Sequence, residues 1–289
     1  MAWLDVLKSV LYGVVEGVTE WLPISSTGHL LLLERLVPFR AGGDAISNAQ
    51  FFSFFLVVVQ LGAVLAVVVT FWSKLWPVRM KDSSLVIDQG IIRLWAMILV
   101  ACVPAAVIGV LFDDKIEQLF YNPWTVAIML IVIGIAFLVV ERVLKDRQKR
   151  PSIRSVEQID WRAAILIGLF QLIAAILPGT SRSGATILGG LMIGMTRSVA
   201  ATFTFYLAVP VMAGASLLKL LKLGTSFNLI QWLSVFVGMG AAYLVSILVI
   251  RFLLAYIRKH DFRIFAFYRI ALGMVVIAAA LSGLFSTVR

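Results

Sequence analysis

Long apolar stretches dominate the pattern of hydrophobic and polar positions along the chain. Six of them come close to the roughly 20 residues that an α-helix needs to cross a bilayer. They cover residues 51–72, 91–112, 124–140, 199–221, 230–250 and 264–285. Tryptophan and tyrosine residues stand near their ends, as is usual at membrane interfaces. The pattern therefore predicts an all-α integral membrane protein with six transmembrane helices.

Two further apolar segments, at about residues 11–36 and 161–195, are interrupted by Pro, Gly, Ser and Thr. Irregular backbone at membrane depth is tolerated only where protein or a water-filled cavity surrounds it. We predict that each segment forms a re-entrant hairpin of two helices. The alternative is two ordinary spans with a kink, because membrane helices tolerate Pro.

The two interrupted segments align with each other at a constant offset of 155 residues. The aligned pairs are Gly13 and Gly168, Glu16 and Gln171, Leu22 and Leu177, Pro23 and Pro178, Ser25 and Thr180, and Ser26 and Ser181. Three predicted spans follow each segment, so the second copy should have inverted topology. We predict one membrane domain made of two inverted repeats, about 1–145 and 155–289, whose turns meet near the midplane. A chance alignment of residues common in membrane helices is the alternative.

Composition agrees with a membrane protein. Of the 289 residues, 61% are hydrophobic and only 14% are charged, and the mean hydropathy is +1.01. An average soluble domain is excluded by these values. The single cysteine, Cys102, lies in an apolar stretch, so a disulfide framework and a thiolate metal site are excluded as well. Acidic residues interrupt the N-terminal segment, 1–22, which we assign to the mature fold rather than to a signal peptide.

The net charge of +10 comes mostly from short loops between the spans. Fourteen Lys and Arg residues fall on the side that receives the loops after the first, third and fifth spans, and seven fall on the other side. By the positive-inside rule the first side is cytoplasmic, both termini are outside, and Asp113, Asp114 and Glu117 lie in an outer loop. Because the cations are not gathered on one surface, we expect no nucleic-acid partner.

Glu16 and Glu20 fall within an apolar run. Residues four apart share one helix face, with β-carbons about 5–6 Å apart. Each carboxylate costs on the order of 3 kcal/mol at the middle of a bilayer. A shared divalent cation, a shared proton or a facing arginine could offset that cost. The alternative is a tilted helix that brings both carboxylates to interfacial water.

A polar turn follows this helix, with the sequence Pro-Ile-Ser-Ser-Thr-Gly-His from Pro23 to His29. Pro ends the helix, and Ser25, Ser26 and Thr27 offer hydroxyl caps to the next one. A hydroxyl, an imidazole and nearby carboxylates are also the groups that nucleophilic or general acid–base hydrolysis requires. A capped turn with a hydrogen-bonded histidine is the alternative.

The second interrupted segment contains the sequence Pro-Gly-Thr-Ser-Arg-Ser-Gly-Ala-Thr, residues 178–186. Hydroxyl groups and backbone N–H groups converge here at the start of a helix, which favours anion binding. The guanidinium of Arg182 matches a phosphate group bidentately. Alternatively, Arg182 forms a buried structural ion pair with Glu16 or Glu20.

These two motifs, Glu16-Gly-Val-Thr-Glu20 with Pro23 to His29 and the segment 178–186, resemble those of the undecaprenyl-diphosphate phosphatases, also called bacitracin-resistance proteins. Both motifs match without departure, and the resemblance covers essentially the whole chain. It implies a bacterial plasma-membrane hydrolase that converts the C55 isoprenyl diphosphate to the monophosphate carrier of cell-wall synthesis. The site would open to the outer face and depend on Mg²⁺ or Ca²⁺.

The resemblance also implies roles for individual residues. Glu16 and Glu20 would bind the metal, and Ser26 and His29 would belong to the catalytic turn together with Arg182. The substrate-binding set would be Ser25, Thr27, Ser181, Arg182, Ser183, Gly184 and Thr186. The nucleophile is either Ser26 or a metal-activated water. A secondary transporter or lipid flippase with an anion site is the alternative function, and a homodimer is among the possible oligomeric states.

Overall fold

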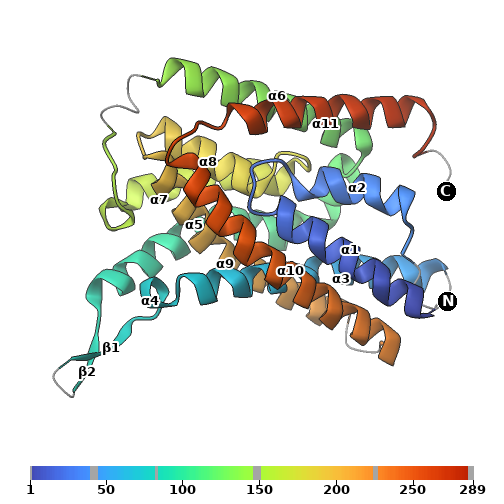
Figure 1. Cartoon of the computed structure of the whole chain (residues 1–289), viewed down its shortest axis with the longest axis horizontal. Helices are drawn as coiled ribbons and strands as arrows, with labels where there is room; N and C mark the ends of the chain where they lie inside the picture. Colours follow the sequence, from blue (N-terminus) through green and yellow to red (C-terminus); the bar gives the residue numbers. More distant parts are fainter. Residues whose placement is uncertain (1, 40–44, 82–83, 146–150, 224–226, 286–289) are drawn as a thin grey trace.

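The structure is a computed structural model that describes residues 2–39, 45–81, 84–145, 151–223 and 227–285 (Figure 1). Its helices are α1 (Ala2–Thr19), α2 (Ser26–Leu36), α3 (Ala45–Thr70), α4 (Trp72–Leu75), α5 (Gln89–Phe120), α6 (Pro123–Val143), α7 (Trp161–Ile176), α8 (Arg182–Met192), α9 (Arg197–Leu223), α10 (Leu229–Ile257) and α11 (Arg263–Leu281). A 3₁₀ helix, η2 (Val156–Gln158), precedes α7. The strands β1 (Val78–Lys81) and β2 (Ser84–Ile87) form an antiparallel hairpin.

The six predicted spans are confirmed, and their bounds shift by a few residues. Helices long and apolar enough to cross a membrane contain Gln50–Thr70, Gln89–Phe112, Pro123–Val143, Arg197–Lys222, Leu229–Ile257 and Arg263–Leu281. One prediction is wrong: the segment with Asp113 and Asp114 is not a loop, because α5 continues as a helix to Phe120. The all-α membrane class is therefore established for the part of the chain that is described.

Polar caps explain where several apolar runs begin to form helix. Asp88 accepts hydrogen bonds from the first backbone N–H groups of α5, and Asn122 accepts one at the start of α6. Asp160 does the same for α7, and Asn228 forms a capping box with Gln231 at α10. Such side chains satisfy the N–H groups that a helix leaves without partners.

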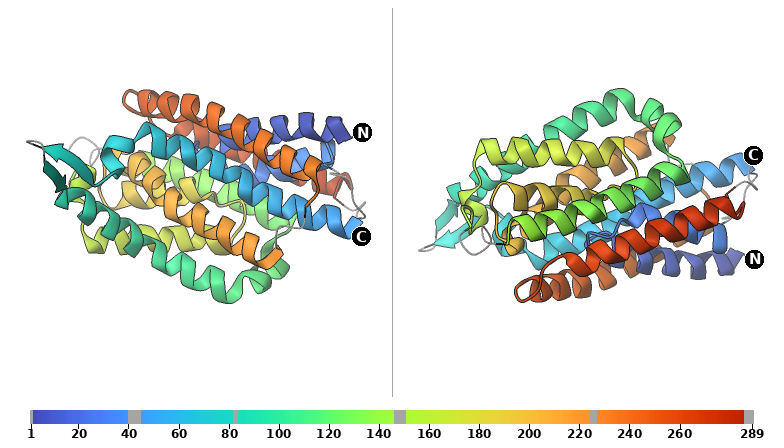
Figure 2. Two further views of the ribbon diagram at one scale, coloured as in Figure 1. Left: turned by 90° about the horizontal axis from the view of Figure 1, so that it is seen from below. Right: turned by 90° about the horizontal axis from the view of Figure 1, so that it is seen from above.

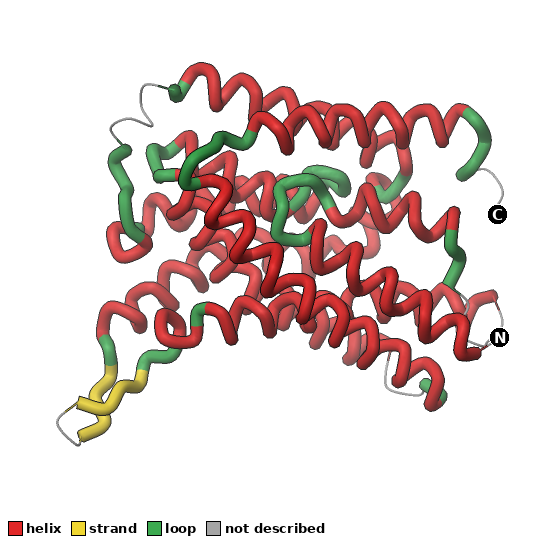
Figure 3. Tube along the Cα trace, viewed as in Figure 1, coloured by secondary structure: helices red, strands yellow, loops and turns green. Residues whose placement is uncertain are grey.

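The two interrupted segments each form a pair of packed helices, α1 with α2 and α7 with α8. With 11 residues each, α2 and α8 reach about 16 Å at 1.5 Å per residue, roughly half of a 30 Å bilayer core. The loops at residues 20–25 and 177–181 lie in the middle of the molecule (Figure 3). These observations favour re-entrant hairpins over kinked spans, and the membrane placement of the pairs stays a prediction.

Helices of one half of the chain pack against helices of the other half. The first helix of each half packs on a helix of the other half, α1 on α10 and α7 on α5. Gly13 and Gly168, which the 155-residue offset pairs, lie where these helices approach each other closely. A Cβ at Gly168 would lie 2.6 Å from the Ala101 carbonyl oxygen, and one at Gly13 would overlap the Gly238 carbonyl oxygen. Both positions therefore require glycine, as expected if the halves repeat.

The offset between the halves is not constant along the whole chain. Helices α5 and α10 begin at Gln89 and Leu229, 140 residues apart, and α6 and α11 have the same separation. Eighteen residues, 71–88, connect α3 to α5, whereas five residues, 224–228, connect α9 to α10. The β1–β2 hairpin thus accounts for the difference between the two halves. The inverted orientation of the halves remains a prediction.

Candidate active site

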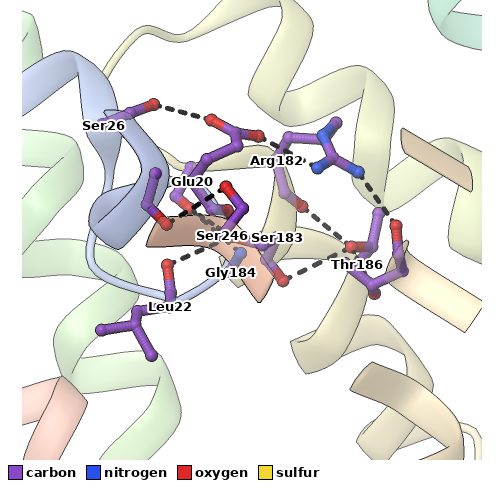
Figure 4. A network of polar contacts seen from close by, with 11 residues as sticks. Glu20, Leu22, Ser26, Arg182, Ser183, Gly184, Thr186 and Ser246 are labelled. Carbon is purple, nitrogen blue, oxygen red and sulfur yellow. Dashed lines mark hydrogen bonds and ion pairs between the residues drawn. The ribbon is translucent and has the colours of Figure 1, made fainter. Parts of the chain in front are cut away.

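The loops of the two helix pairs bring three predicted site residues together. Glu20 follows α1, Ser26 begins α2 and Arg182 begins α8. The Ser26 hydroxyl donates to Glu20 Oε2 at 2.9 Å, and Arg182 Nη2 donates to Glu20 Oε1 at 3.0 Å (Figure 4). The carboxylate of Glu20, which is 6% exposed, therefore bridges a hydroxyl and a guanidinium from different halves of the chain.

Arg182 is held in place by further contacts. Its Nη1 donates to the Thr204 backbone carbonyl at 3.0 Å, and its guanidinium carbon lies 6.0 Å from the centroid of the Trp21 ring. The Nε of Arg182 is buried and has no hydrogen-bond partner among the described residues. One donor of the fork is thus available to an additional acceptor without breaking an existing bond.

Glu16 is almost completely buried, at 1% exposure. Both of its carboxylate oxygens lack a hydrogen-bond partner within the described ranges, and Glu20 and Gln60 are its polar neighbours. A buried, uncompensated carboxylate is costly. The arrangement fits a divalent cation, because Mg²⁺ is usually held by one or two carboxylates together with substrate phosphates and water. The described part of the chain has no group of three or more His, Cys, Asp or Glu side chains suited to an ion.

The hydroxyl groups of the motif at residues 178–186 mainly form hydrogen bonds to other protein groups. Ser183 donates to the backbone carbonyl oxygens of Glu20 and Leu22 at 3.0 and 3.3 Å, and so joins α8 to the end of α1. Ser181 caps α8 by accepting from Gly184 N at 3.1 Å. Thr186 bonds to the Arg182 carbonyl and to the Thr204 hydroxyl in α9. We predicted these residues as substrate contacts; in the structure their side chains contact protein groups.

The hydrogen-bond partners of His29 are not members of the Ser26–Glu20–Arg182 cluster. Its Nδ1 is 2.7 Å from the Ser25 carbonyl oxygen, and its Nε2 is 2.7 Å from the Tyr268 hydroxyl on α11, whose ring is stacked on the imidazole. A carbonyl only accepts, so Nδ1 carries the proton and a neutral imidazole accepts from Tyr268. Both ring nitrogens have a hydrogen-bond partner, and neither partner is Ser26.

The Oγ of Ser25 is buried without a partner among the described residues.

A cavity of about 470 Å³ opens beside the cluster. Ser26 and Thr27 of α2 and Gln60 of α3 supply hydroxyl and amide groups to its wall, and much of the rest is apolar. Its lining continues to Glu34, Ile116, Glu117, Tyr121, Pro178 and Lys219. Burial, with Glu34 and Glu117 nearby, raises the pKa of Tyr121 to about 12, so its hydroxyl stays protonated. The cavity therefore connects the cluster with the end of the molecule where α5 and α9 end.

Arg269 on α11 is a site residue that the sequence reasoning left unassigned. Its side chain is fully buried, and it donates to the carbonyl oxygens of Pro23 at 3.1 Å, Gly179 at 2.9 Å and Thr180 at 2.8 Å, with a longer bond to Leu130. The first loop and the second loop are thereby tied to one guanidinium. An arginine inside an apolar span was the available signal, since such charges are seldom tolerated without a role.

This fold and site define a class: a multi-span α-helical membrane protein whose buried carboxylates, serine and arginine meet where two broken helix pairs touch. The family model for bacitracin resistance protein BacA matches residues 9–275, so the chain belongs to that family. Similar proteins named undecaprenyl-diphosphatase come from Desulfitobacterium hafniense, 50% identical over 96% of both chains, and Enterococcus faecalis, 46% identical over 95% of this chain and 97% of the relative. Undecaprenyl-diphosphatase 1 of Clostridium acetobutylicum is 47% identical over 96% and 98%.

Proposed function

We propose that this protein is an undecaprenyl-diphosphatase: it hydrolyses undecaprenyl diphosphate to undecaprenyl phosphate and inorganic phosphate. In a bacterium this reaction recycles the lipid carrier of cell-wall synthesis and gives resistance to bacitracin. The observation that carries the proposal is the Glu20 carboxylate between Ser26 and Arg182. Relatives of nearly equal length with that name support the substrate.

The positions of Arg182, Ser26 and Glu20 support a separate role for each of them. Arg182 binds the terminal phosphate and stabilises its charge in the transition state. Ser26 Oγ attacks the terminal phosphorus while Glu20, already its hydrogen-bond acceptor at 2.9 Å, takes the proton. The bond from phosphorus to the bridging oxygen breaks, and undecaprenyl phosphate leaves with its electron pair. A water molecule then hydrolyses the phosphoserine and releases inorganic phosphate.

Glu16 and Glu20 are the residues that would hold a divalent cation, Mg²⁺ or Ca²⁺. The support is the pair of Glu16 oxygens that are buried without a partner in the described part of the chain. When bound, such an ion neutralises charge on phosphate oxygens. The protein's own contribution is to keep these carboxylates in a buried site beside Arg182 and Ser26.

The cavity supports an opening toward the outer face of the plasma membrane. Glu34, Tyr121 and Lys219 in its lining lie near the ends of α2, α5 and α9, where the loops with fewer cations begin. The isoprenyl tail stays in the bilayer, and the diphosphate enters between α2, α3 and α9. If the two halves are inverted repeats, the loops at residues 20–25 and 177–181 would lie at the same depth in the membrane. The close helix contacts at Gly13 and at Gly168, which occupy equivalent positions in the two halves, support such a repeat.

The experiment measures inorganic phosphate released from undecaprenyl diphosphate by purified protein. Arg182→Ala and Ser26→Ala should each lose at least about 100-fold in kcat/KM, the scale of removing a transition-state donor. Arg258→Ala, at an exposed cation outside the site, is the matched control and should keep its rate. Full activity in Arg182→Ala would overturn the assignment of the phosphate site.

Two further measurements separate the remaining proposals. With substrate labelled in the terminal phosphate, the wild type should retain label on the protein after rapid acid quenching, and Ser26→Ala should not. An unlabelled wild type together with an active Ser26→Ala variant would assign attack to water. Activity that EDTA leaves unchanged would contradict the cation proposal.

A further inference from the structure

The β1–β2 hairpin stands out as the element that the helical core does not require. It projects beyond the helices at one end of the molecule (Figures 1 and 2). Strand pairing in the described structure is confined to this hairpin and one isolated bridge between residues 153 and 195. The link between α9 and α10 manages with five residues, 224–228, so eighteen residues are not needed to connect α3 to α5.

The register of the hairpin separates its side chains by chemistry. Val78 pairs with Ile87 and Met80 pairs with Leu85, so these four side chains lie on one face. Arg79 pairs with Val86 on the opposite face. Met80 and Leu85 are each 73% exposed, and Ile87 is 56% exposed. Val78 is partly buried, so the exposed part of this apolar face consists of Met80, Leu85 and Ile87.

The residues that lead into the hairpin are those found at a membrane interface. Trp72 and Trp76 are about half exposed and stacked on each other, with ring centroids 4.8 Å apart. Lys74 stands between them and is exposed. Arg79 is more than half exposed at its side chain, although it also pairs with Asp88 at 3.3 Å. Tryptophan belts and Lys or Arg residues next to spans are typical of contact with lipid head groups.

The hairpin cannot move far from the bilayer. The spans on either side end at Thr70 and begin at Gln89. Strands of four residues reach about 13 Å at 3.3 Å per residue, which exceeds the roughly 5–8 Å of head-group region on one side of a bilayer. A hairpin seated in this region would therefore lie along the membrane plane. The end of the molecule that carries the hairpin also receives the cation-rich loops.

We propose that the β1–β2 hairpin is a lipid-binding element that seats its apolar face, Val78, Met80, Leu85 and Ile87, in the interface of an anionic phospholipid leaflet. Lys74 and Arg79 bind the lipid phosphates there. In this position the β1–β2 hairpin would resemble an amphipathic helix that lies in the membrane plane with its apolar face toward the lipid. It would anchor the cation-rich end of the protein independently of the phosphatase site.

The test places a nitroxide label on each face of the hairpin in reconstituted protein. Because Cys102 is the only cysteine, Cys102→Ser provides the background for Met80→Cys, Leu85→Cys and, as the matched control from the opposite face, Val86→Cys. In vesicles of phosphatidylcholine with phosphatidylglycerol, labels at 80 and 85 should collide more with oxygen than with a water-soluble nickel complex. The label at 86 should show the reverse preference.

The contribution of the cations is tested in the same system. Lys74→Glu with Arg79→Glu should lower the oxygen preference at position 80, and Arg258→Glu, elsewhere at the same end, should not. Omitting phosphatidylglycerol should have the effect of the double variant. Equal exposure of positions 80, 85 and 86 to water would overturn the proposal. Spin–spin broadening at position 80 that persists after dilution with lipid would also overturn it, because such broadening would show that the apolar face contacts a second copy of the chain.

Discussion

Ser25 and Ser181 adopt nearly the same unusual backbone conformation, with φ of +75° and +68°, and each stands directly before the first residue of a helix. They are the non-glycine residues with positive φ in the described part of the chain. Such a conformation costs about 1–3 kcal/mol and tends to occur at functional sites. The residues that follow, Ser26 and Arg182, therefore occupy the same helical position in the two halves, and both contact Glu20.

The equivalence of these serines corrects the alignment of the two loops by one residue. The constant offset of 155 pairs Ser25 with Thr180 and Ser26 with Ser181, whereas the backbone pairs Ser25 with Ser181, 156 residues away. One residue, Ile24, separates Pro23 from Ser25, whereas Gly179 and Thr180 separate Pro178 from Ser181, and Gly179 has a φ of +89°. A Cβ at Gly179 would also lie within 3 Å of the backbone of Val126, so this residue must be glycine.

Replacing Arg182 by lysine tests the geometry of the guanidinium rather than its charge. Lysine keeps a positive group near Glu20, but it cannot donate to both Thr204 O and Glu20 and still offer a further donor to phosphate. We expect Arg182→Lys to lower kcat/KM by about 100-fold with little change in the melting temperature. Phosphate release and thermal unfolding in the same detergent measure the two effects. Activity within about threefold of wild type would contradict a bidentate role.

Arg269 should determine the stability of both loops at once. Arg269→Met leaves the carbonyl groups of Pro23, Gly179 and Thr180 buried without their donor. Each unsatisfied group costs about 1–3 kcal/mol, so the free energy of unfolding should fall by roughly 3 kcal/mol or more. Thermal unfolding in detergent measures the loss. Arg269→Lys should recover part of it, and an unchanged melting temperature in Arg269→Met would show that the loops do not depend on this residue.

His29 should act on the shape of the first loop rather than on proton transfer. Its Nδ1 donates to the Ser25 carbonyl and its Nε2 contacts Tyr268. We expect His29→Gln to lower kcat by roughly tenfold or less, below the 10²–10⁴-fold typical of general acid–base groups, and to leave the shape of the pH–rate profile unchanged. Tyr268→Phe should have a smaller effect. Loss of one limb of the pH profile in His29→Gln would instead support the general acid–base role that the motif from Pro23 to His29 suggests.

The close contact of α7 with α5 makes a stability prediction with an internal control. In Gly168→Ala the new methyl group would lie 2.6 Å from the Ala101 carbonyl oxygen, so the helices must separate. Overpacking of this kind costs about 1–3 kcal/mol, and the melting temperature should fall. Gly240→Ala on α10 is the control, because its Cβ meets nothing within 4 Å. Equal melting temperatures for the two variants would contradict close packing at Gly168.

The membrane spans could be predicted from the sequence because lipid demands long apolar helices with satisfied backbone groups. The charges Glu16, Glu20 and Arg182 were found for the same reason, as residues that do not belong in an apolar run. The sequence did not distinguish Glu20, which bridges two partners, from Glu16, whose oxygens have none among the described residues. Both residues fit one helix face in the sequence pattern. Their contacts differ because α8 begins beside Glu20, where Arg182 donates to its carboxylate.

Contacts between distant segments account for what the sequence could not predict. His29 and Tyr268 are 239 residues apart, and Arg269 reaches the first loop across 246 residues. No local pattern specifies such pairs, since they depend on how α11 packs against α2 and α6. The end of α5 was misjudged for a different reason: acidic residues after an apolar run suggest a loop, yet the helix continues beyond the apolar part of the span.

The position of Arg269 in α11 has a consequence for biosynthesis. The helix α11 follows both loops in the chain, so until it enters the membrane the loops at residues 20–25 and 177–181 lack the guanidinium that joins them. A chain whose synthesis stops after α10 would carry every residue of both motifs, and the contacts of Ser183 and Arg182 with the first loop, but would lack the three carbonyl contacts of Arg269. Full ordering of the two loops is thereby coupled to insertion of α11, and we expect truncated products to be less active than the full chain.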